Sequence, residues 1–197
     1  MLLQPPATTP PNHTTPSLFL VSPENEMALP RLCLEPLVVA HATALYTALQ
    51  DPALYTFIPQ DPPLSLADLL VRYAALSMRR SPTGQEVWLN WVLRRRGTDD
   101  YVGAVQATIH EDRTTMLAYM IFPSFWGHGY AREGCARVLT HLREAYDVSR
   151  VAAEIDTRNT ASIQLIEVLG FNRVALTPHA DFFKGAESDE YLFELHQ

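Results

Sequence analysis

Two glycines at the start of an amphipathic helix are the feature of this sequence with the clearest chemical potential. Gly127 and Gly129 follow an apolar run, residues 116–122, and precede apolar residues at helical spacing that begin at Ala131. The first main-chain N–H groups of a helix have no partner inside it, and the helix dipole places partial positive charge there. Such groups can bind a phosphate, and glycine lets another group approach the main chain closely. An ordinary turn between a strand and a helix fits the two glycines equally well.

A dinucleotide fingerprint fits this stretch less well. Arg132 stands where the third glycine of that fingerprint belongs, and a hairpin meander precedes the motif instead of a βαβ unit. The chain that follows is too short for a doubly wound sheet, and the sequence contains no phosphate loop that ends in Lys-Ser or Lys-Thr. Use of the glycine loop by a nucleotide-binding protein of another kind remains a rival hypothesis.

Composition narrows the possible partners. The 197 residues are 47% hydrophobic and carry a formal net charge of −7, which argues for one globular domain and against a nucleic-acid partner. Cys33, Cys135 and the seven histidines show no metal-ligand spacing, so we expect no metal and reduced cysteines, as in a cytoplasmic protein. No apolar run approaches the length of a membrane span and the first residues do not resemble a signal peptide, so we expect no membrane partner.

The order of elements predicts an α+β fold. Residues 1–28 are rich in Pro and Thr and are expected to form a flexible arm, and residues 29–197 a single domain. About seven strands should form a mixed, mostly antiparallel sheet, because short polar turns join the three central strands and a helix joins the third to the fourth. The strand at 150–155 should therefore lie parallel to residues 116–122. The expected strands are 31–35, 86–94, 101–110, 115–122, 150–155, 171–176 and 191–195, the expected helices are 40–50, 65–80, 131–146 and 160–169, and a loop is expected at 177–190.

Several motifs in order resemble one enzyme family. Residues 126–131 (Trp-Gly-His-Gly-Tyr-Ala), 159–162 (Asn-Thr-Ala-Ser) and 169–171 (Leu-Gly-Phe) resemble the GNAT superfamily of acetyl-CoA-dependent N-acetyltransferases. The Pro30-Arg31-Leu32 opening, among other features, is similar to the ribosomal-protein-alanine acetyltransferase branch. The resemblance covers about residues 29–196. It implies helices on both faces of the sheet and a splayed pair of parallel strands that holds coenzyme A.

The resemblance also implies residues for the coenzyme. In the family the glycine loop wraps the pyrophosphate with main-chain N–H groups, and the pantetheine arm lies beside the preceding strand like an additional strand. Asn159 has two compatible roles, as a helix cap and as a coenzyme contact. Carried onto this chain, the loop residues are Trp126, Gly127, His128, Gly129, Tyr130, Ala131 and Arg132, and the pantetheine residues are Met120, Ile121 and Phe122.

The implied chemistry is direct acetyl transfer to an amine in a ternary complex, without a cysteine nucleophile. The attacking amine must be neutral, and the departing thiolate needs a proton. Ser162 aligns with the serine of the family's Asn-x-x-Ser motif and is a candidate donor to the sulfur, although a serine at this helical position also serves local capping. Met116 occupies the position where related enzymes often carry a carboxylate. Glu154 is then the best candidate base, Tyr119 and His110 are weaker candidates, and a bound water is an alternative.

The acceptor is expected over the two early helices and the 177–190 loop. Carboxylates that could hold a cationic amine there are Asp51, Asp61, Asp181 and Glu187. A protein N-terminus or a small-molecule amine fits, and the sequence does not choose between them. It is compatible with a monomer or a homodimer. The alternative to an enzyme is a non-catalytic relative that binds coenzyme A as a sensor or interaction module, which the missing carboxylate at Met116 keeps open.

Overall fold

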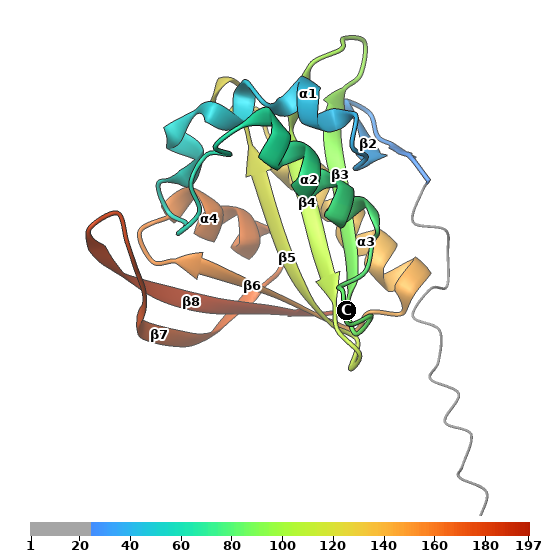
Figure 1. Ribbon diagram of the computed structural model, residues 1–197. Coiled ribbons are helices and arrows are strands. Elements are labelled where there is room, and N and C mark those ends of the chain that lie inside the picture. The colour runs from blue at the N-terminus through green and yellow to red at the C-terminus, as the bar shows by residue number, and fades with distance from the viewer. Residues whose placement is uncertain (1–24) are drawn as a thin grey trace, which may run out of the picture.

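One eight-stranded sheet organises residues 25–197, the part of the chain that the computed structural model describes (Figure 1). The strand order is β1-β2-β3-β4-β5-β6-β8-β7. The strands are β1 (Met27–Ala28), β2 (Leu32–Pro36), β3 (Val87–Arg95), β4 (Tyr101–Ile109), β5 (Thr114–Ile121), β6 (Arg150–Asp156), β7 (Asn172–Phe183) and β8 (Ala186–His196). The helices are α1 (His41–Leu45), α2 (Leu66–Ser77), α3 (Tyr130–Tyr146) and α4 (Thr160–Val168), with short 3₁₀ turns η1 (Ala48–Gln50), η2 (Pro52–Tyr55) and η3 (Pro123–Phe125).

The sheet has one strand more than the predicted seven. The additional strand is β1, in which Met27 and Ala28 pair with Leu34 and Cys33 of β2. Residues 27–28, predicted as the end of the flexible arm, thus belong to the sheet. Residues 1–24 of the predicted arm lie outside the described residues.

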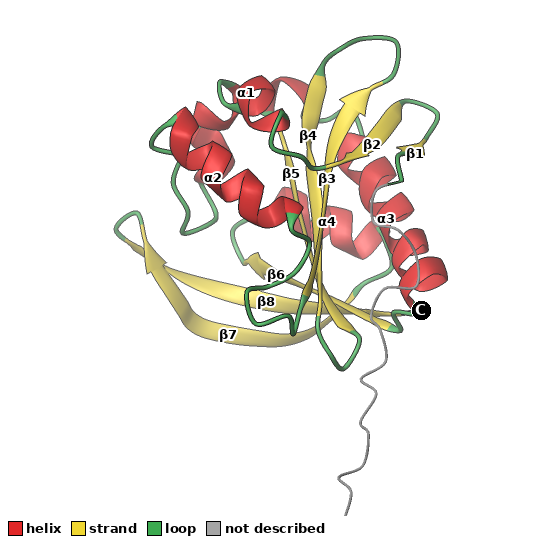
Figure 2. Ribbon diagram, turned by 45° about the vertical axis from the view of Figure 1, so that its right-hand side comes forward, coloured by secondary structure: helices red, strands yellow, loops and turns green. Residues whose placement is uncertain are grey.

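Helices cover both faces of the sheet, as predicted for an α+β fold (Figures 1 and 2). The apolar stripe of α3 packs with α4 on one face, and the buried residues there form the larger core. On the other face, α1 and α2 form a smaller core with Val92 of β3 and Phe122. No helix among residues 25–197 combines the length and apolar character needed to cross a lipid bilayer.

The sheet contains one parallel pair, formed by β5 and β6. A helix connects these two strands, which makes the parallel arrangement accessible. The pairing covers only residues 114–116 of β5 and 150–152 of β6. Beyond Met116 of β5 and Ala152 of β6, β5 remains paired with β4 and β6 remains paired with β8. The two strands therefore separate, as expected for the splayed pair of the fold prediction.

Two local predictions are wrong. The predicted helix 40–50 ends at Leu45, and the chain continues as the η1 and η2 turns. Asp51 separates these two turns, because its side chain caps η2 by accepting a hydrogen bond from the Ala53 amide. The predicted loop 177–190 is a long hairpin, in which β7 reaches Phe183 and β8 starts at Ala186. The sequence conceals this hairpin because Pro178, which cannot donate to a strand ladder, lies inside β7, and because residues 172–180 of this edge strand are all exposed.

Candidate active site

The glycine loop presents a run of free main-chain donors at the start of α3. Gly127 and Gly129 have φ values of 75° and 77°, a left-handed conformation that glycine adopts without strain. Within residues 25–197, none of the main-chain N–H groups of residues 127–132 donates to a protein acceptor, and the first amide to do so is that of Glu133, which bonds to the Gly129 carbonyl at 3.2 Å. Residues 127–129 are also exposed. The loop therefore has the donors that a phosphate needs, as the sequence predicted.

The gap between β5 and β6 exposes main-chain groups of alternate β5 residues. At the two ends of the β4–β5 pair, His110 donates to the Thr114 carbonyl and Phe122 donates to the Val102 carbonyl, each at 2.9 Å. The register between these ends is uninterrupted, so the even-numbered residues of β5 bond to β4 and the odd-numbered ones face β6. From Leu117 onward β6 is no longer paired with β5, and the outward groups of residues 117, 119 and 121 face the gap.

This register shows which residues of the predicted pantetheine set direct main-chain groups toward the gap. Met120 and Phe122 direct their main-chain groups away from the gap, toward β4 and the η3 turn. Ile121 and Tyr119 direct theirs toward the gap, because both are odd-numbered residues of β5. The Ile121 carbonyl already accepts a hydrogen bond from the indole of Trp126 at 2.6 Å. The sequence could have shown the alternation of β5 but not which of its two edges opens.

Trp126 and His128 fix the shape of the loop. The Trp126 side chain is half exposed and its indole joins the loop to the end of β5. The Nδ1 of His128 donates to the Trp126 carbonyl at 2.8 Å, and the His128 ring stacks on Tyr130 with centroids 5.9 Å apart. The loop is therefore held by its side chains and carbonyls, while its amides stay free.

Ser162 lies in the first turn of α4 with an unengaged hydroxyl. The cap of this helix is formed by Asn159, whose side-chain oxygen accepts from the main-chain N–H of Ser162 at 3.2 Å. Within the described residues the Ser162 hydroxyl makes no hydrogen bond of its own, so local capping does not use it. The prediction of Asn159 as the cap is confirmed, and the Ser162 hydroxyl is available for chemistry.

Tyr119 ties α4 to β5. Its hydroxyl donates to the Ser162 carbonyl at 3.3 Å, and burial raises the pKa of the phenol well above its usual value. The hydroxyl thus stays protonated at any physiological pH and is engaged in a contact that places Ser162 beside β5. This geometry fits a positioning role better than the predicted catalytic one.

Glu154 lies on the opposite face of the sheet. Val151, Ala153 and Ile155 of β6 are buried in the larger core with α3 and α4, so the alternating residue Glu154 points to the face of α1 and α2, where it is exposed. Ser162 and Glu154 therefore approach the gap from its two sides. This arrangement allows one group to act on the leaving sulfur and the other on the amine.

Glu190 is a second carboxylate on this face, and sequence reasoning missed it. Burial raises the pKa of Glu190, and the nearby carboxylates of Glu154, Asp181 and Asp156 raise it further. Glu190 pairs with Asp156 across β6 and β8. Burial alone would raise the pKa of Asp156 as well, but hydrogen bonds from Arg158 and Ser188 outweigh burial and hold it below its usual range. Glu190 could have been found only from the strand pairing, which its local sequence does not reveal.

The four carboxylates predicted to hold the amine have other contacts in the structure. Asp51 accepts from the Ala53 amide, and Asp61 lies 3.7 Å from the Lys184 ammonium. Glu187 pairs with His179 at 2.7 Å. Asp181 accepts from the Phe182 amide and also lies close enough to Glu190 to raise its pKa. Of these four carboxylates, Asp181 is the one that belongs to the group of carboxylates around Glu190.

The tip of the β7–β8 hairpin is tied to the segment before α2. Lys184, in the turn of the hairpin, donates to the carbonyls of Ile58 and Gln60 at 2.9 and 3.1 Å. This contact joins residues more than 120 positions apart in the chain. It connects the hairpin that carries Glu190 with the turn region between η2 and α2.

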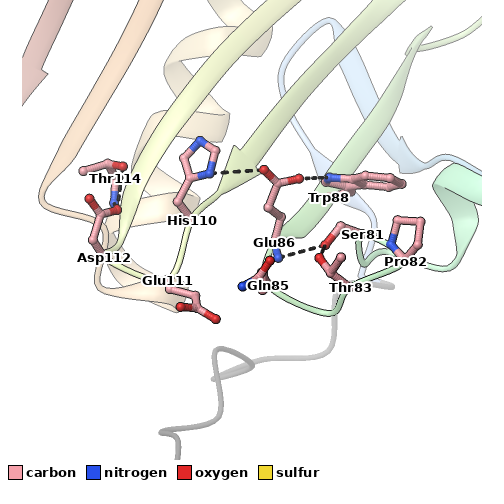
Figure 3. A pocket seen from close by; sticks show the side chains of 10 residues that line it. All are labelled: Ser81, Pro82, Thr83, Gln85, Glu86, Trp88, His110, Glu111, Asp112 and Thr114. Carbon is pink, nitrogen blue, oxygen red and sulfur yellow. Dashed lines mark hydrogen bonds and ion pairs between the residues drawn. The ribbon is translucent and has the colours of Figure 1, made fainter.

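The structure also has a hollow at the opposite end of the central strands (Figure 3). It has a volume of about 670 Å³ and lies between the 81–86 loop and the β4–β5 turn. Its carboxylates are largely occupied, because Glu86 contacts His110 and the Trp88 indole, while Asp112 accepts from Thr114. No three His, Cys, Asp or Glu side chains within residues 25–197 are placed to hold a metal ion. This hollow shares no residue with the glycine loop or the gap.

The free amides of the loop and the opening strand pair together define a GNAT-type acetyltransferase domain. Residues 31–172 match the family model of the acetyltransferase (GNAT) domain, which is well over half of the chain, so the chain belongs to this family. A curated relative is the uncharacterized N-acetyltransferase YoaA of Bacillus subtilis, 26% identical over 109 residues. The match covers 54% of this chain and 62% of YoaA.

Solved structures agree with the fold. RimL, a ribosomal alpha-N-protein acetyltransferase in complex with coenzyme A, has a TM-score of 0.78 at 16% identity, over 87% of this chain and 98% of RimL. A chimera of the spermidine N-acetyltransferase SpeG from Vibrio cholerae has a TM-score of 0.71 at 18% identity, over 84% of this chain and 95% of that chain. These similarities support the GNAT architecture.

Proposed function

We propose that the protein transfers an acetyl group from acetyl-CoA directly to a primary amine in a ternary complex. The observation that carries this proposal is the run of free amides at residues 127–132 beside the gap between β5 and β6. Free N–H groups at a helix N-terminus suit a diphosphate. An unpaired strand edge suits the amide groups of a pantetheine arm.

When bound, acetyl-CoA supplies the activated acyl group, and the residues around the gap perform the remaining tasks. The outward N–H groups of Tyr119 and Ile121 are the main-chain donors available to the pantetheine amides and the thioester carbonyl. The Ser162 hydroxyl donates a hydrogen bond to the departing thiolate as the carbon–sulfur bond breaks, and the proton that the amine loses balances the charge of that thiolate. Glu154, directly or through a water, takes the proton that the attacking amine loses as the new carbon–nitrogen bond forms.

A cationic amine is the acceptor class that this site favours. Glu154 and Glu190 lie on the face of the sheet that carries α1 and α2, here called the open face, with Asp181 nearby. No cationic side chain within residues 25–197 forms an ion pair with any of the three. Carboxylates attract a protonated amine, and one of them can then accept its proton. A protein N-terminus and a small-molecule amine both satisfy this requirement.

Calorimetric titration with acetyl-CoA tests the first half of the proposal, and thiol release with a panel of amines tests the second. We expect saturable binding with one site and release of thiol with at least one primary amine. Absence of binding at millimolar acetyl-CoA would refute the proposal.

The alternative is a coenzyme A-binding module without catalysis. The observation that favours it is Met116, which replaces the carboxylate that related enzymes often carry on this strand and which lies in the paired part of β5, opposite Ala152. Binding of acetyl-CoA without thiol release for any amine of the panel would support this alternative.

A further inference from the structure

One arginine holds the glycine loop from the side away from its free amides. Arg31 directly precedes β2 and donates from its guanidinium to the His128 carbonyl at 2.8 Å and to the Gly129 carbonyl at 3.5 Å. Its Nε donates to Glu133 at 2.6 Å, and its main-chain N–H donates to the other oxygen of Glu133 at 3.0 Å. The guanidinium also lies over the Tyr130 ring, 5.0 Å from the centroid. One side chain thus joins the first strands to the loop and to the first turn of α3.

The planarity of the peptide bond turns these contacts into an orientation of the loop amides. The described residues contain no cis peptide, so the C=O and N–H of each peptide unit point in opposite directions. The His128 carbonyl shares its peptide unit with the Gly129 N–H, and the Gly129 carbonyl shares its unit with the Tyr130 N–H. The Arg31 contact at 2.8 Å fixes the His128 carbonyl, so the Gly129 N–H points away from Arg31 and toward the open side of the loop. The Gly129 carbonyl is held by the Glu133 N–H at 3.2 Å together with Arg31 at 3.5 Å, and these two contacts orient the Tyr130 N–H.

We propose that Arg31 is a positioning residue for coenzyme A binding, which prepares the glycine loop as a diphosphate site. This inference rests on the proposed function, because it assigns the reason why the loop amides are aimed before any ligand arrives. A preorganised donor set binds more tightly because the ordering cost is already met in the free protein. Without this contact, the two glycines that flank His128 would leave the loop many conformations.

The contribution of Arg31 is geometric more than electrostatic. Glu133 neutralises the guanidinium at 2.6 Å, so the pair adds little net charge to the loop. The planar guanidinium reaches one carboxylate and two carbonyls at once, and a lysine ammonium has no such fork. Glu133 lies in the first turn of α3, where its charge would compete with a bound phosphate. The contact with Arg31 keeps that carboxylate on the reverse side of the loop.

The test compares Arg31→Met and Arg31→Lys with Arg96→Met. Arg96 is a matched control, because it is also exposed and also donates to a carbonyl, that of Leu29 at 3.0 Å, but it does not touch the loop. We expect Arg31→Met to raise the Kd of coenzyme A by about tenfold, the change that the loss of one charge-assisted contact produces. Arg31→Lys should recover only a small part of this loss, and Arg96→Met should stay near the wild-type value.

A second donor separates positioning of the loop from general damage. Acetyl-pantetheine lacks the diphosphate, so its rate of acetyl transfer should be the same in Arg31→Met and wild type. With acetyl-CoA the KM should rise in Arg31→Met, while kcat at saturation is unchanged. Equal Kd values for wild type and Arg31→Met, or an equal loss with both donors, would overturn the role of Arg31. Failure of the wild type itself to bind coenzyme A would instead refute the proposed function.

Discussion

The two halves of the proposed site differ in how completely the protein arranges them. In the cofactor half, the carbonyls of Trp126, His128 and Gly129 have side-chain partners, and the neighbouring amides are free. In the acceptor half, Glu154 and Glu190 share an open face without a cationic partner in the described residues. The first half is ready for its ligand, and the second holds unbalanced negative charge.

This difference follows from what each half has to bind. The acyl donor, acetyl-CoA, always has the same chemical structure, so main-chain groups can bind it whatever the side chains are. An acceptor is distinguished by its own chemistry, so its half depends on a few side chains on distant strands. We therefore expect changes in the loop to affect every reaction of the protein, and changes on the open face to affect the choice and use of the amine.

Breaking the cofactor half should give the largest effect. In Gly129→Val, a β-branched residue must occupy φ near 77°, so the loop changes its conformation and its amides lose their common direction. We expect the Kd of coenzyme A to rise at least about 100-fold, equivalent to about 2.7 kcal/mol or more. Calorimetry measures this directly.

Gly84→Val is the matched control for the loop variant. Gly84 has a φ of 75° and open space around it, but it lies in the turn after α2, next to the remote hollow. The two variants should lose similar amounts of stability, because both place valine in the left-handed region. A loss of coenzyme binding of the same size in Gly84→Val would show that strain, not loop geometry, accounts for the effect.

The next effect concerns Ser162, which lies between the two halves. Ser162→Ala removes the hydroxyl but keeps the main-chain N–H that Asn159 caps. We expect kcat to fall by about 30-fold, somewhat less than the loss of a full general acid or of an oxyanion-hole donor usually costs. Coenzyme affinity and the melting temperature should remain unchanged.

Asn159→Ala is expected to do the reverse of Ser162→Ala, lowering stability while leaving kcat unchanged. It removes the cap of α4 and should cost about 1 kcal/mol of stability. If Ser162→Ala kept full kcat, the Ser162 hydroxyl would have no part in the mechanism. The only role left to this residue would be that of its main-chain N–H, which donates to the Asn159 cap.

The cofactor half could be predicted from the sequence because its signals are local. The glycine spacing, the amphipathic pattern of α3 and the Asn159 cap lie within short stretches, and the structure contains all of them. The parallel pairing of β6 with β5 followed from the helix between them. The proposed role of Arg31 was beyond this reasoning. The Pro30-Arg31-Leu32 opening contributed to the family resemblance, but 97 positions separate Arg31 from His128 and nothing in its local pattern indicates the contact.

The acceptor half could not be predicted to the same depth. Its key feature, the β7–β8 hairpin, consists of an exposed edge strand and a partner with weak alternation, so the chain resembles a loop with Pro178. Glu190 lies opposite Asp156 and diagonal to Glu154 only because β8 inserts between β6 and β7, a pairing that no local motif encodes. Long-range strand order is the information that the sequence pattern lacks.

Loosening the acceptor half should give a moderate effect. Lys184→Met removes the contacts between the hairpin tip and the Ile58 and Gln60 carbonyls. We expect the KM of the amine to rise by about fivefold, since loss of hydrogen bonds to a charged group costs on the order of 1 kcal/mol and upward. Coenzyme affinity should not change. Steady-state kinetics with saturating acetyl-CoA provide the measurement.

Arg173→Met is the corresponding control on the same hairpin. Arg173 lies on β7 over the ring of Tyr191, 4.5 Å from the centroid, and it does not reach the 57–61 segment. Its amine KM should match that of the wild type. An equal rise in both variants would mean that any disturbance of the hairpin suffices, and that the Lys184 contact has no particular role.

The smallest effect tests the unbalanced charge of the acceptor half through stability. A raised pKa means that folded Glu190 binds its proton more tightly than the unfolded chain does, so its contribution is most favourable at low pH and is lost as pH rises through the raised value. At pH 7 the carboxylate is charged beside Glu154 and Asp181, and Glu190→Gln should stabilise the protein by about 0.5 kcal/mol, typical of relieving like charges on paired strands.

The gain from Glu190→Gln should shrink as pH falls below the raised pKa of Glu190, because the Glu190 carboxyl is then protonated in the folded protein, and thermal melts from pH 7 downward measure it. Glu194→Gln is the control, because Glu194 lies on the same strand but pairs with Arg150 and His196 at 3.5 and 3.4 Å. Its replacement should not stabilise the protein. If Glu190→Gln instead destabilised it at pH 7, the open face would be electrostatically balanced, and the expectation of a cationic acceptor would lose its main physical support.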